Sequence, residues 1–310
     1  MTFSIIQDIK NNVNKVVVGK SDVIELMLTA MLAEGHVLLE DLPGTGKTLL
    51  AKVLAKSMGG DFNRIQFTPD LLPSDVTGFQ FYDMKKGEFY YKKGPVMTNV
   101  LLADEINRTI PRTQSSLLES MGEFQVTVDN VTYPLPKPFF VIATQNPIDL
   151  NGTYPLPEAQ LDRFLFKLSL GYPNSDEELQ ILNRFESEDP LNSLGSVTSP
   201  EEIVQMSKDV KNILISDAMK KYIINIINET RSSELFSIGA STRASIHIMR
   251  SSQAFAAVKG RNYVIPDDIK YIVPFVLCHR LKLSDKEKFK GKLVNEAVST
   301  LLNTIPVPIN

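Results

Sequence analysis

A glycine-rich segment at residues 41–48, DLPGTGKT, limits the possible folds of this chain more than any other feature. It follows an apolar, β-rich run at 36–40 (HVLLE) and precedes a helical pattern at 49–58. In this strand–loop–helix context, small residues let backbone N–H groups surround a phosphate at a helix N-terminus, where the helix dipole also favours an anion. The residues predicted to form this phosphate-binding loop are Pro43, Gly44, Thr45, Gly46, Lys47, Thr48 and Leu49.

Two polar side chains of this loop have expected chemical roles. Lys47 would reach the β- and γ-phosphates of a nucleotide, and the Thr48 hydroxyl would bind Mg²⁺. The strict pattern begins with glycine, whereas this chain has Asp41. Gly44 and Gly46 remain where the backbone must approach the phosphates, so the departure carries little weight. The alternative, a glycine-rich turn with a solvated lysine, is disfavoured by the matching strand and helix.

Short β-rich runs alternate with helical patterns between residues 36 and 170. The runs lie at 36–40, 64–67, 100–104, 139–144 and 164–168. Near-continuous apolar strands separated by helices predict a three-layer α/β core around a parallel five-stranded sheet. Two further stretches, 79–91 with a turn at Lys86-Gly87 and 124–133 with a turn at Asp129-Asn130, predict inserted β-hairpins.

The pattern changes to helices after residue 172. Helix-start motifs occur at 175–178 (SDEE), 199–202 (SPEE) and 266–268 (PDD), and a polar linker occupies 186–197. The chain has 310 residues, and at about 150 residues per domain that length fits two domains. We therefore expect an α/β domain over 1–172 and an all-helical domain over 173–310.

Composition excludes several classes of protein. Apolar residues make up 43% and charged residues 22%, which is typical of a globular protein and not of a disordered or fibrous one. The net charge of −3 includes no basic excess, which argues against nucleic acid as a partner. The single cysteine, Cys278, cannot close an intrachain disulfide. With no apolar leader at the N-terminus and no apolar run long enough to span a membrane, the sequence predicts a cytoplasmic protein.

Polar residues follow two of the predicted strands. The strand at 100–104 ends in Asp104 and Glu105; Asp104 would hold the water shell of Mg²⁺, and Glu105 would activate the attacking water. Two acidic residues after a strand are usually just solvated side chains at the end of that strand. Only the presence of the upstream phosphate loop favours a catalytic role for this pair. Asn146 follows the strand at 139–144 and would bring an amide to the same crevice. The spacing is equally compatible with Asn146 simply starting a turn before Pro147.

Two arginines are further candidates. Arg163 precedes the last strand, on the side of an α/β domain away from its own phosphate loop, which suits an arginine finger supplied to a neighbouring subunit. Arg243 follows the good N-cap Ser241 and lies in the first turn of a helix, where a guanidinium is unfavourable unless it meets an anion such as a phosphate. For either arginine taken alone, a surface salt bridge is the commoner explanation.

The motifs and their order resemble the MoxR family of AAA+ ATPases. The phosphate loop is followed by DEINR at 104–108, TQNP at 144–147, LPEAQLDRF at 156–164 and GASTRAS at 239–245. Agreement continues in VVGK at 17–20, RIQFTPDLLPSDVTG at 64–78, GPVMTNVLLADEINR at 94–108 and PDDIKYIVPFVLCHRL at 266–281. The resemblance covers about residues 13 to 285 and implies a P-loop NTPase core of the AAA+ type followed by a helical lid.

The resemblance also implies roles for individual residues. Lys47 and Thr48 match the Walker A motif, and Asp104 and Glu105 match the Walker B motif. Asn146 matches sensor 1, Arg163 matches the arginine finger, and Arg243 matches sensor 2. Val17, Val18 and Gly19 match the segment that packs on the adenine. ATP or ADP with Mg²⁺ would lie between the two domains, with Arg243 contacting phosphate from the lid. The implied assembly is a ring, a hexamer, in which Arg163 acts in trans.

The implied function is remodelling or maturation of partner proteins, some of which carry a von Willebrand factor A domain. One alternative is a nucleotide-switched scaffold with slow hydrolysis. Another is a nucleic-acid-directed ATPase, for which the hairpin lysines Lys85, Lys86, Lys92 and Lys93 are the only support. The aromatic residues of the first hairpin, Phe79, Phe81, Phe89, Tyr90 and Tyr91, form either a partner-binding patch or, as is commoner, packing against the domain.

Overall fold

The centre of the molecule is a parallel five-stranded sheet with the strand order β2-β5-β8-β1-β9. The computed structural model describes residues 4–147, 152–186 and 189–308. The strands are β1 (Val37–Glu40), β2 (Phe62–Gln66), β5 (Val100–Asp104), β8 (Phe140–Gln145) and β9 (Phe166–Leu168). All five predicted strands are confirmed, with ends that shift by one or two residues.

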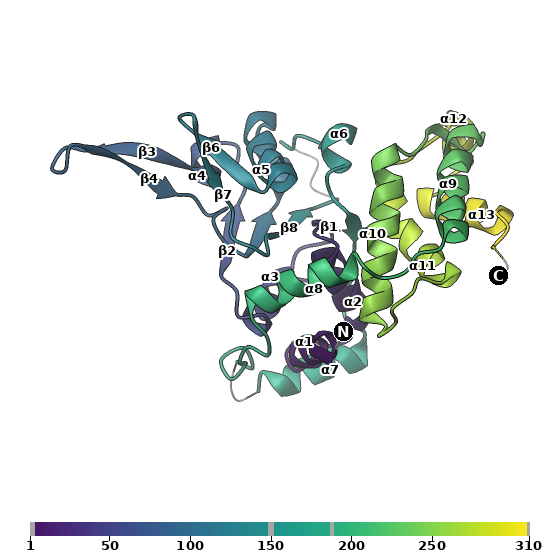
Figure 1. The fold of residues 1–310 in the computed structure, drawn as a ribbon, viewed down its shortest axis with the longest axis horizontal. Helices are drawn as coiled ribbons and strands as arrows, with labels where there is room; N and C mark the ends of the chain where they lie inside the picture. The colour runs from purple at the N-terminus through teal and green to yellow at the C-terminus, as the bar shows by residue number, and fades with distance from the viewer. Residues whose placement is uncertain (1–3, 148–151, 187–188, 309–310) are drawn as a thin grey trace.

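Helices cover both faces of this sheet, so the predicted three-layer core is confirmed (Figure 1). Leu39 of β1 packs with Leu50 in one buried cluster, whereas its neighbour Leu38 packs with Leu117 in the other. This alternation is what a strand buried on both faces requires. The covering helices are α1 (Ser4–Asn14), α2 (Ser21–Leu32) and α3 (Lys47–Ser57) on the first side and α4 (Pro73–Thr77) and α5 (Pro111–Glu123) on the second.

Both predicted hairpins are present. They are β3 (Gly78–Asp83) with β4 (Glu88–Lys93) and β6 (Gln125–Val128) with β7 (Val131–Pro134). Asp129 and Asn130 have φ angles of 48° and 64°, the conformation that a two-residue hairpin turn with the right twist requires. The β3–β4 hairpin extends away from the body of the molecule (Figure 1).

Helices dominate the chain after residue 172. They are α7 (Ser175–Arg184), α8 (Pro200–Val210), α9 (Asp217–Ser232), α10 (Thr242–Val258), α11 (Pro266–Leu277), α12 (Asp285–Phe289) and α13 (Val294–Thr304). Ser199 and Ser241 cap α8 and α10 as expected, while α7 is capped by Asn174, one residue before the expected Ser175. The region 173–310 is not all-helical as expected, because it contains two short strands, β10 (Phe236–Ile238) and β11 (Lys282–Leu283), that pair with each other.

The helices α9 to α13 form the lid, which lies to one side of the core (Figure 1). Helix α10 packs against α2, and α11 packs against β9. One cluster of buried apolar side chains runs from the sheet through these contacts to α13. The lid is therefore firmly attached to the core at the β9 edge of the sheet. Among the described residues, no helix combines the length and apolar character that crossing a bilayer requires.

Candidate active site

The phosphate loop forms one wall of a cavity of about 500 Å³ at the carboxyl ends of the strands. Gly44 and Gly46 have φ angles of 83° and 87°, a left-handed conformation that glycine adopts without steric cost. Among the described residues, no side chain caps the N-terminus of α3. Its first backbone N–H groups are therefore available to an anion.

The Lys47 ammonium group is already held over the loop. Its Nζ donates to the carbonyl oxygens of Leu42 at 2.9 Å and Asp41 at 3.1 Å. These are neutral acceptors, and a phosphate oxygen placed in the cavity would be a stronger one. The side chain is thus oriented towards the role that the sequence predicts.

Asp41, the residue that departs from the strict loop pattern, has a structural explanation. It is only 5% exposed, and its carboxylate accepts three hydrogen bonds from the segment after β9. The donors are the backbone N–H groups of Leu170 at 2.7 Å and Gly171 at 3.0 Å and the hydroxyl of Ser169 at 2.7 Å. Asp41 therefore fastens the start of the phosphate loop to the neighbouring edge strand.

Asp104 and Glu105 form the opposite wall of the cavity. Thr144 on β8 connects the two residues, because its hydroxyl donates to Asp104 Oδ1 at 2.6 Å and accepts from the Glu105 N–H at 2.9 Å. Glu105 has a φ angle of 56°, which is uncommon for a residue with a side chain and tends to occur at functional sites. The two carboxylates are thus positioned by contacts between neighbouring strands.

Thr144 and Gln145, which precede Asn146 in the TQNP motif, also line the cavity, as do Arg64 and Gln66, to which the sequence analysis gives no role. Arg64 on β2 binds Asp104 Oδ2 through Nη2 at 2.6 Å, and the amide of Gln66 donates to Glu105 Oε2 at 2.7 Å. In the RIQ pattern at 64–66, Arg64 and Gln66 are two residues apart and therefore lie on the same face of the strand. This alternation is the sequence signal that places both side chains on one side of β2.

The donor set fits Mg²⁺ bound together with a nucleotide. Mg²⁺ is usually held by one or two protein oxygens plus substrate phosphates, and not by a complete protein cage. Thr48 in the first turn of α3 and Asp104 across the cavity supply two such oxygens. In the described part of the chain there is no group of three or more metal-binding side chains, so a resident cage is absent.

The other predicted residues divide into two sets. Asn146 lines the cavity with Lys47, Thr48 and the two carboxylates. The segment 17–19 does not line it: Val18 is buried, and a side chain at Gly19 would collide with the carboxylate of Glu177. This segment instead packs against the first turn of α7.

Arg163 and Arg243 lie together in a second cavity, of about 210 Å³, and neither lines the phosphate-loop cavity. Arg163 donates through Nη1 to the carbonyl of Leu118. Arg243 lies 3.5 Å from Asp162 Oδ2. For Arg163 this is the placement that the sequence predicts.

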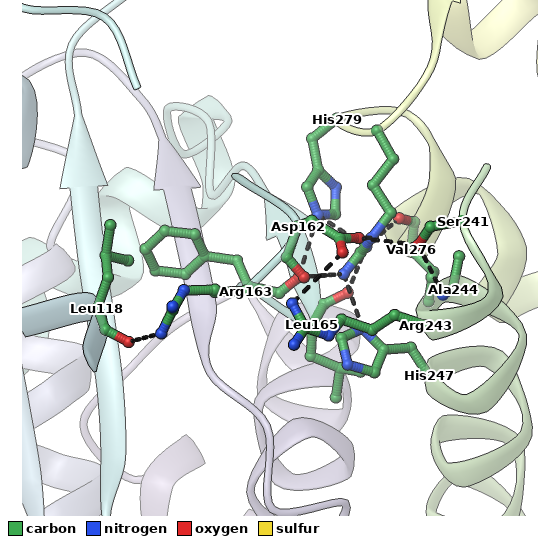
Figure 2. A network of polar contacts seen from close by, with 12 residues as sticks. Leu118, Asp162, Arg163, Leu165, Ser241, Arg243, Ala244, His247, Val276 and His279 are labelled. Carbon is green, nitrogen blue, oxygen red and sulfur yellow. Dashed lines mark hydrogen bonds and ion pairs between the residues drawn. The ribbon is translucent and has the colours of Figure 1, made fainter. Parts of the chain in front are cut away.

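Arg243 lies beside Asp162 and outside the phosphate-loop cavity. Helix α10, which carries Arg243 in its first turn, packs against α2. The contact of Arg243 with a phosphate, and the place of the nucleotide between the two domains, stay predictions. Figure 2 shows Arg243 close to Asp162, with Arg163 pointing away from both towards Leu118.

Comparison with known families and structures agrees with this arrangement. A model of the ATPase family associated with various cellular activities (AAA) matches residues 36–166, and a model of the AAA lid domain matches residues 228–301. A solved structure from Cytophaga hutchinsonii superposes with a TM-score of 0.92 at 40% identity, over 99% of this chain and 96% of the other.

The sequences of several known proteins align with almost the whole chain. The YeaC protein of Bacillus subtilis is 52% identical over 96% of this chain and 93% of its own length. The protein named chaperone MoxR1 of Mycobacterium tuberculosis is 40% identical over 96% of this chain and 80% of its own. The MoxR protein of Paracoccus denitrificans is 30% identical over 97% and 96%. On this evidence, together with its fold and motifs, the chain belongs to the MoxR family of AAA ATPases.

Proposed function

We propose that this chain is a Mg²⁺-dependent ATPase that works as a hexameric ring and uses hydrolysis to remodel or mature partner proteins in the cytoplasm. The observation that carries the proposal is the division of the predicted catalytic residues between two cavities. Lys47, Thr48, Asp104, Glu105 and Asn146 line one, and Arg163 lines the other. A site divided in this way is completed by a second copy of the chain.

Each residue of the phosphate-loop cavity has a defined role in this proposal. The α3 N-terminus and Lys47 bind the phosphates, and Thr48 and Asp104 hold the metal ion. When bound, Mg²⁺ neutralises the charge that develops on the phosphates. Glu105 accepts a proton from the attacking water, and Asn146 orients that water or the γ-phosphate. Val17, Val18 and Gly19 are proposed to contact the adenine after a local rearrangement at α7.

Arg163 would add a positive charge to the phosphate-loop cavity of an adjacent subunit. Its guanidinium would reach the γ-phosphate bound to an adjacent subunit, where an arginine finger is worth about 10³ to 10⁵ in kcat. Arg243 lies in the same cavity, so we assign it to the same neighbouring nucleotide. Its pairing with Asp162 in the single chain is at 3.5 Å, loose enough to be replaced by a phosphate contact.

The exposed aromatic side chains of the β3–β4 hairpin support a protein as the partner. Phe79, Phe81 and Phe89 are exposed, whereas Tyr91 stacks on Tyr133 with ring centroids 4.1 Å apart. The predicted packing therefore holds for Tyr91 and not for the three phenylalanines. Lys86 and Lys92 lie over the rings of Tyr90 and Phe79, so these two lysines pack on aromatic side chains of their own hairpin. Proteins with a von Willebrand factor A domain are among the partners to test.

The variant Glu105→Gln tests the proposed chemistry. It keeps the size of the side chain and one acceptor oxygen but removes the base, so ATP affinity should be unchanged while hydrolysis falls by about 10² or more. Glu229→Gln, at an exposed position on α9, is the matched control and should keep full activity. Unchanged turnover in the Glu105 variant would contradict the assignment of the base. Capture of bound proteins on the ATP-loaded variant would then identify the partner.

A further inference from the structure

One buried arginine, Arg280, connects the lid to the segment that carries Arg163. It follows α11 in the chain, is only 8% exposed, and its guanidinium group contacts the core at several points. Nε donates to Asp162 Oδ1 at 2.8 Å, and Nη2 donates to the carbonyl oxygens of Asp162 at 3.1 Å and Phe164 at 2.5 Å. Nη1 donates to the carbonyl of Leu165 at 3.3 Å.

These contacts hold the backbone on both sides of Arg163. The carbonyl of Asp162 precedes Arg163 in the chain and that of Phe164 follows it, so one guanidinium group fixes both flanking peptide groups. The Arg163 side chain leaves the backbone in the opposite direction, towards Leu118. Figure 2 shows Arg163 and Leu118 on one side and Asp162, His247, Val276 and His279 gathered on the other.

The contacts use the geometry of arginine and not merely its charge. A guanidinium group has five N–H donors in a rigid plane, and here they reach four carbonyl or carboxylate groups of the core and the carbonyl of Val276 in α11. Lysine has three donors on one nitrogen and cannot span the same acceptors. A group of this kind costs desolvation energy when buried, so general lid packing would not by itself require it.

His247 on α10 extends the contact into the lid. Its Nδ1 lies 2.7 Å from Arg280 Nη2 and shares the two Nη2 hydrogens with the Asp162 and Phe164 carbonyls. Because a guanidinium group cannot accept, Nδ1 is the acceptor and the ring is neutral. Burial, followed by the charge of Arg280, lowers the pKa of His247 to about 3. The same helix carries Arg243 in its first turn. The position of the Arg163 segment is therefore tied to the lid helices α10 and α11.

We infer that Arg280 is a positioning residue for Arg163: it holds the flanking backbone so that the Arg163 guanidinium is presented to the nucleotide site of the adjacent subunit. This rests on the proposed function, in which Arg163 acts in trans. The consequence is specific, because a defect at Arg280 should impair the neighbour's site and not the subunit's own.

Mixed assemblies test this directly. Subunits with Lys47→Ala lack phosphate binding but still supply Arg163, whereas subunits with Arg163→Ala have an intact phosphate cavity and supply no finger. Each should be inactive alone, and mixing the two should restore ATP hydrolysis. If mixing restores nothing although both subunit types assemble, the proposed action of Arg163 in trans is wrong, which is a different outcome from failure of the inference about Arg280.

Arg280→Lys is then placed on one subunit type at a time. On the Lys47→Ala subunit, which supplies the finger, it should reduce the restored kcat by about 10²-fold, the cost of a small misplacement of a catalytic group. On the Arg163→Ala subunit the same substitution should leave the restored activity unchanged. Equal losses in both arrangements would mean that Arg280 only stabilises the lid, and no loss in either would also overturn the inference.

Two further variants keep the test decisive if Arg280→Lys folds poorly. Asp162→Asn keeps the shape of the acceptor but weakens its bond to Arg280, and should give a smaller loss with the same dependence on the subunit that carries it. Arg261→Lys is the matched control, because Arg261 pairs with Asp268 at 2.5 Å within the lid and contacts nothing near Arg163 among the described residues. It should change thermal stability at most, and leave restored kcat intact in either arrangement.

Discussion

Asp41 shows how a single departure from a motif can strengthen the site that the motif builds. Glycine at this position would leave the backbone N–H groups of Leu170 and Gly171 without the carboxylate that they now contact. The bonds join the loop at the end of β1 to the segment after β9, two strands that are neighbours in the sheet. The phosphate loop is therefore fixed from outside as well as by α3.

Replacing Asp41 should cost stability and nucleotide affinity together. Asp41→Ala leaves buried donors unsatisfied, and we expect the free energy of unfolding to fall by about 2 to 4 kcal/mol, with weaker ATP binding. Asp41→Asn keeps one acceptor oxygen and should lose roughly half as much. Chemical denaturation and a nucleotide titration measure the two effects. An Asp41→Ala protein as stable as Asp285→Ala, a change at an exposed carboxylate, would contradict this account.

At the scale of residues, motif spacing predicted which side chains meet at the phosphate loop, because parallel strands deliver their carboxyl ends to one edge. Lys47, Thr48, Asp104, Glu105 and Asn146 do line one cavity. The partners of the carboxylates were missed because Arg64 and Thr144 reach Asp104 from neighbouring strands. Which residues meet across strands depends on strand order and register, and neither follows from local pattern.

At the scale of elements, the two hairpins are connected at their bases. Tyr91 of β4 stacks on Tyr133 of β7, and the Gln80 amide donates to the Tyr133 hydroxyl at 3.3 Å. Towards the tip of β3–β4 the aromatic contacts stay within the hairpin: the rings of Tyr82 and Phe89 have centroids 5.1 Å apart, and Phe89 is 71% exposed. The hairpin thus has a base anchored on β7 and a tip whose aromatic side chains lie largely in solvent.

This arrangement predicts a large and a small loss of stability for two aromatic substitutions. Tyr133→Ala removes the stacking and should lower the free energy of unfolding by about 1 to 2 kcal/mol. Phe89→Ala should change stability by less than about 0.5 kcal/mol, because the side chain is already in solvent. Denaturation curves of the two variants, compared with the unchanged protein, check the difference. Equal effects would mean that the base of the hairpin is not anchored by the tyrosine pair.

The sequence predicted the long elements well and the short ones poorly. The sheet strands and the start of α8 follow from apolar runs and a capping box. Strand β11 has two residues and exists only because β10 lies beside it. The capping of α7 by Asn174 was missed because Ser175 next to it is an equally good N-cap by composition. The existence of β11 and the choice of N-cap for α7 therefore depend on contacts with other parts of the fold and not on the local sequence.

At the scale of the whole molecule, His36 and His279 are buried, His247 is half-buried, and all three histidines resist protonation. Burial lowers the pKa of His36 to about 4 and that of His247 to about 3, and it holds that of His279 well below its usual value. His36 Nδ1 accepts from the Val141 N–H at 3.1 Å, so only the neutral ring fits. The unfolded chain, with histidine pKa values near 6.5, binds these protons more readily.

Stability should therefore fall as the pH is lowered from about 6.5 to 5.5, by roughly 1 kcal/mol for each histidine. In this window the unfolded state gains protons that the folded state does not, so the free energy of unfolding rises with pH. Urea denaturation at several pH values measures the slope. His36→Gln should be less stable at pH 7.5 but lose less on acidification. A stability that does not change across this window would show that the histidines ionise without unfolding.

In the proposed function, the division of the predicted catalytic residues between two cavities makes assembly a condition of activity. In a single subunit, Arg163 contacts the carbonyl of Leu118 in a cavity that contains no part of the phosphate loop. In the proposed ring, a neighbouring subunit brings its own phosphate cavity to this arginine. By our inference, buried Arg280 and the lid helices hold Arg163 in position for that contact. The ring is thus part of the catalytic apparatus in this account.

The central claim is tested most directly by measuring ATP turnover per subunit as a function of protein concentration, with the mass of the assembly followed by light scattering in the same samples. We expect a kcat per subunit that rises with the fraction assembled and is lower by about 10³ or more in the monomer. A monomeric sample that hydrolyses ATP at the full rate would contradict it.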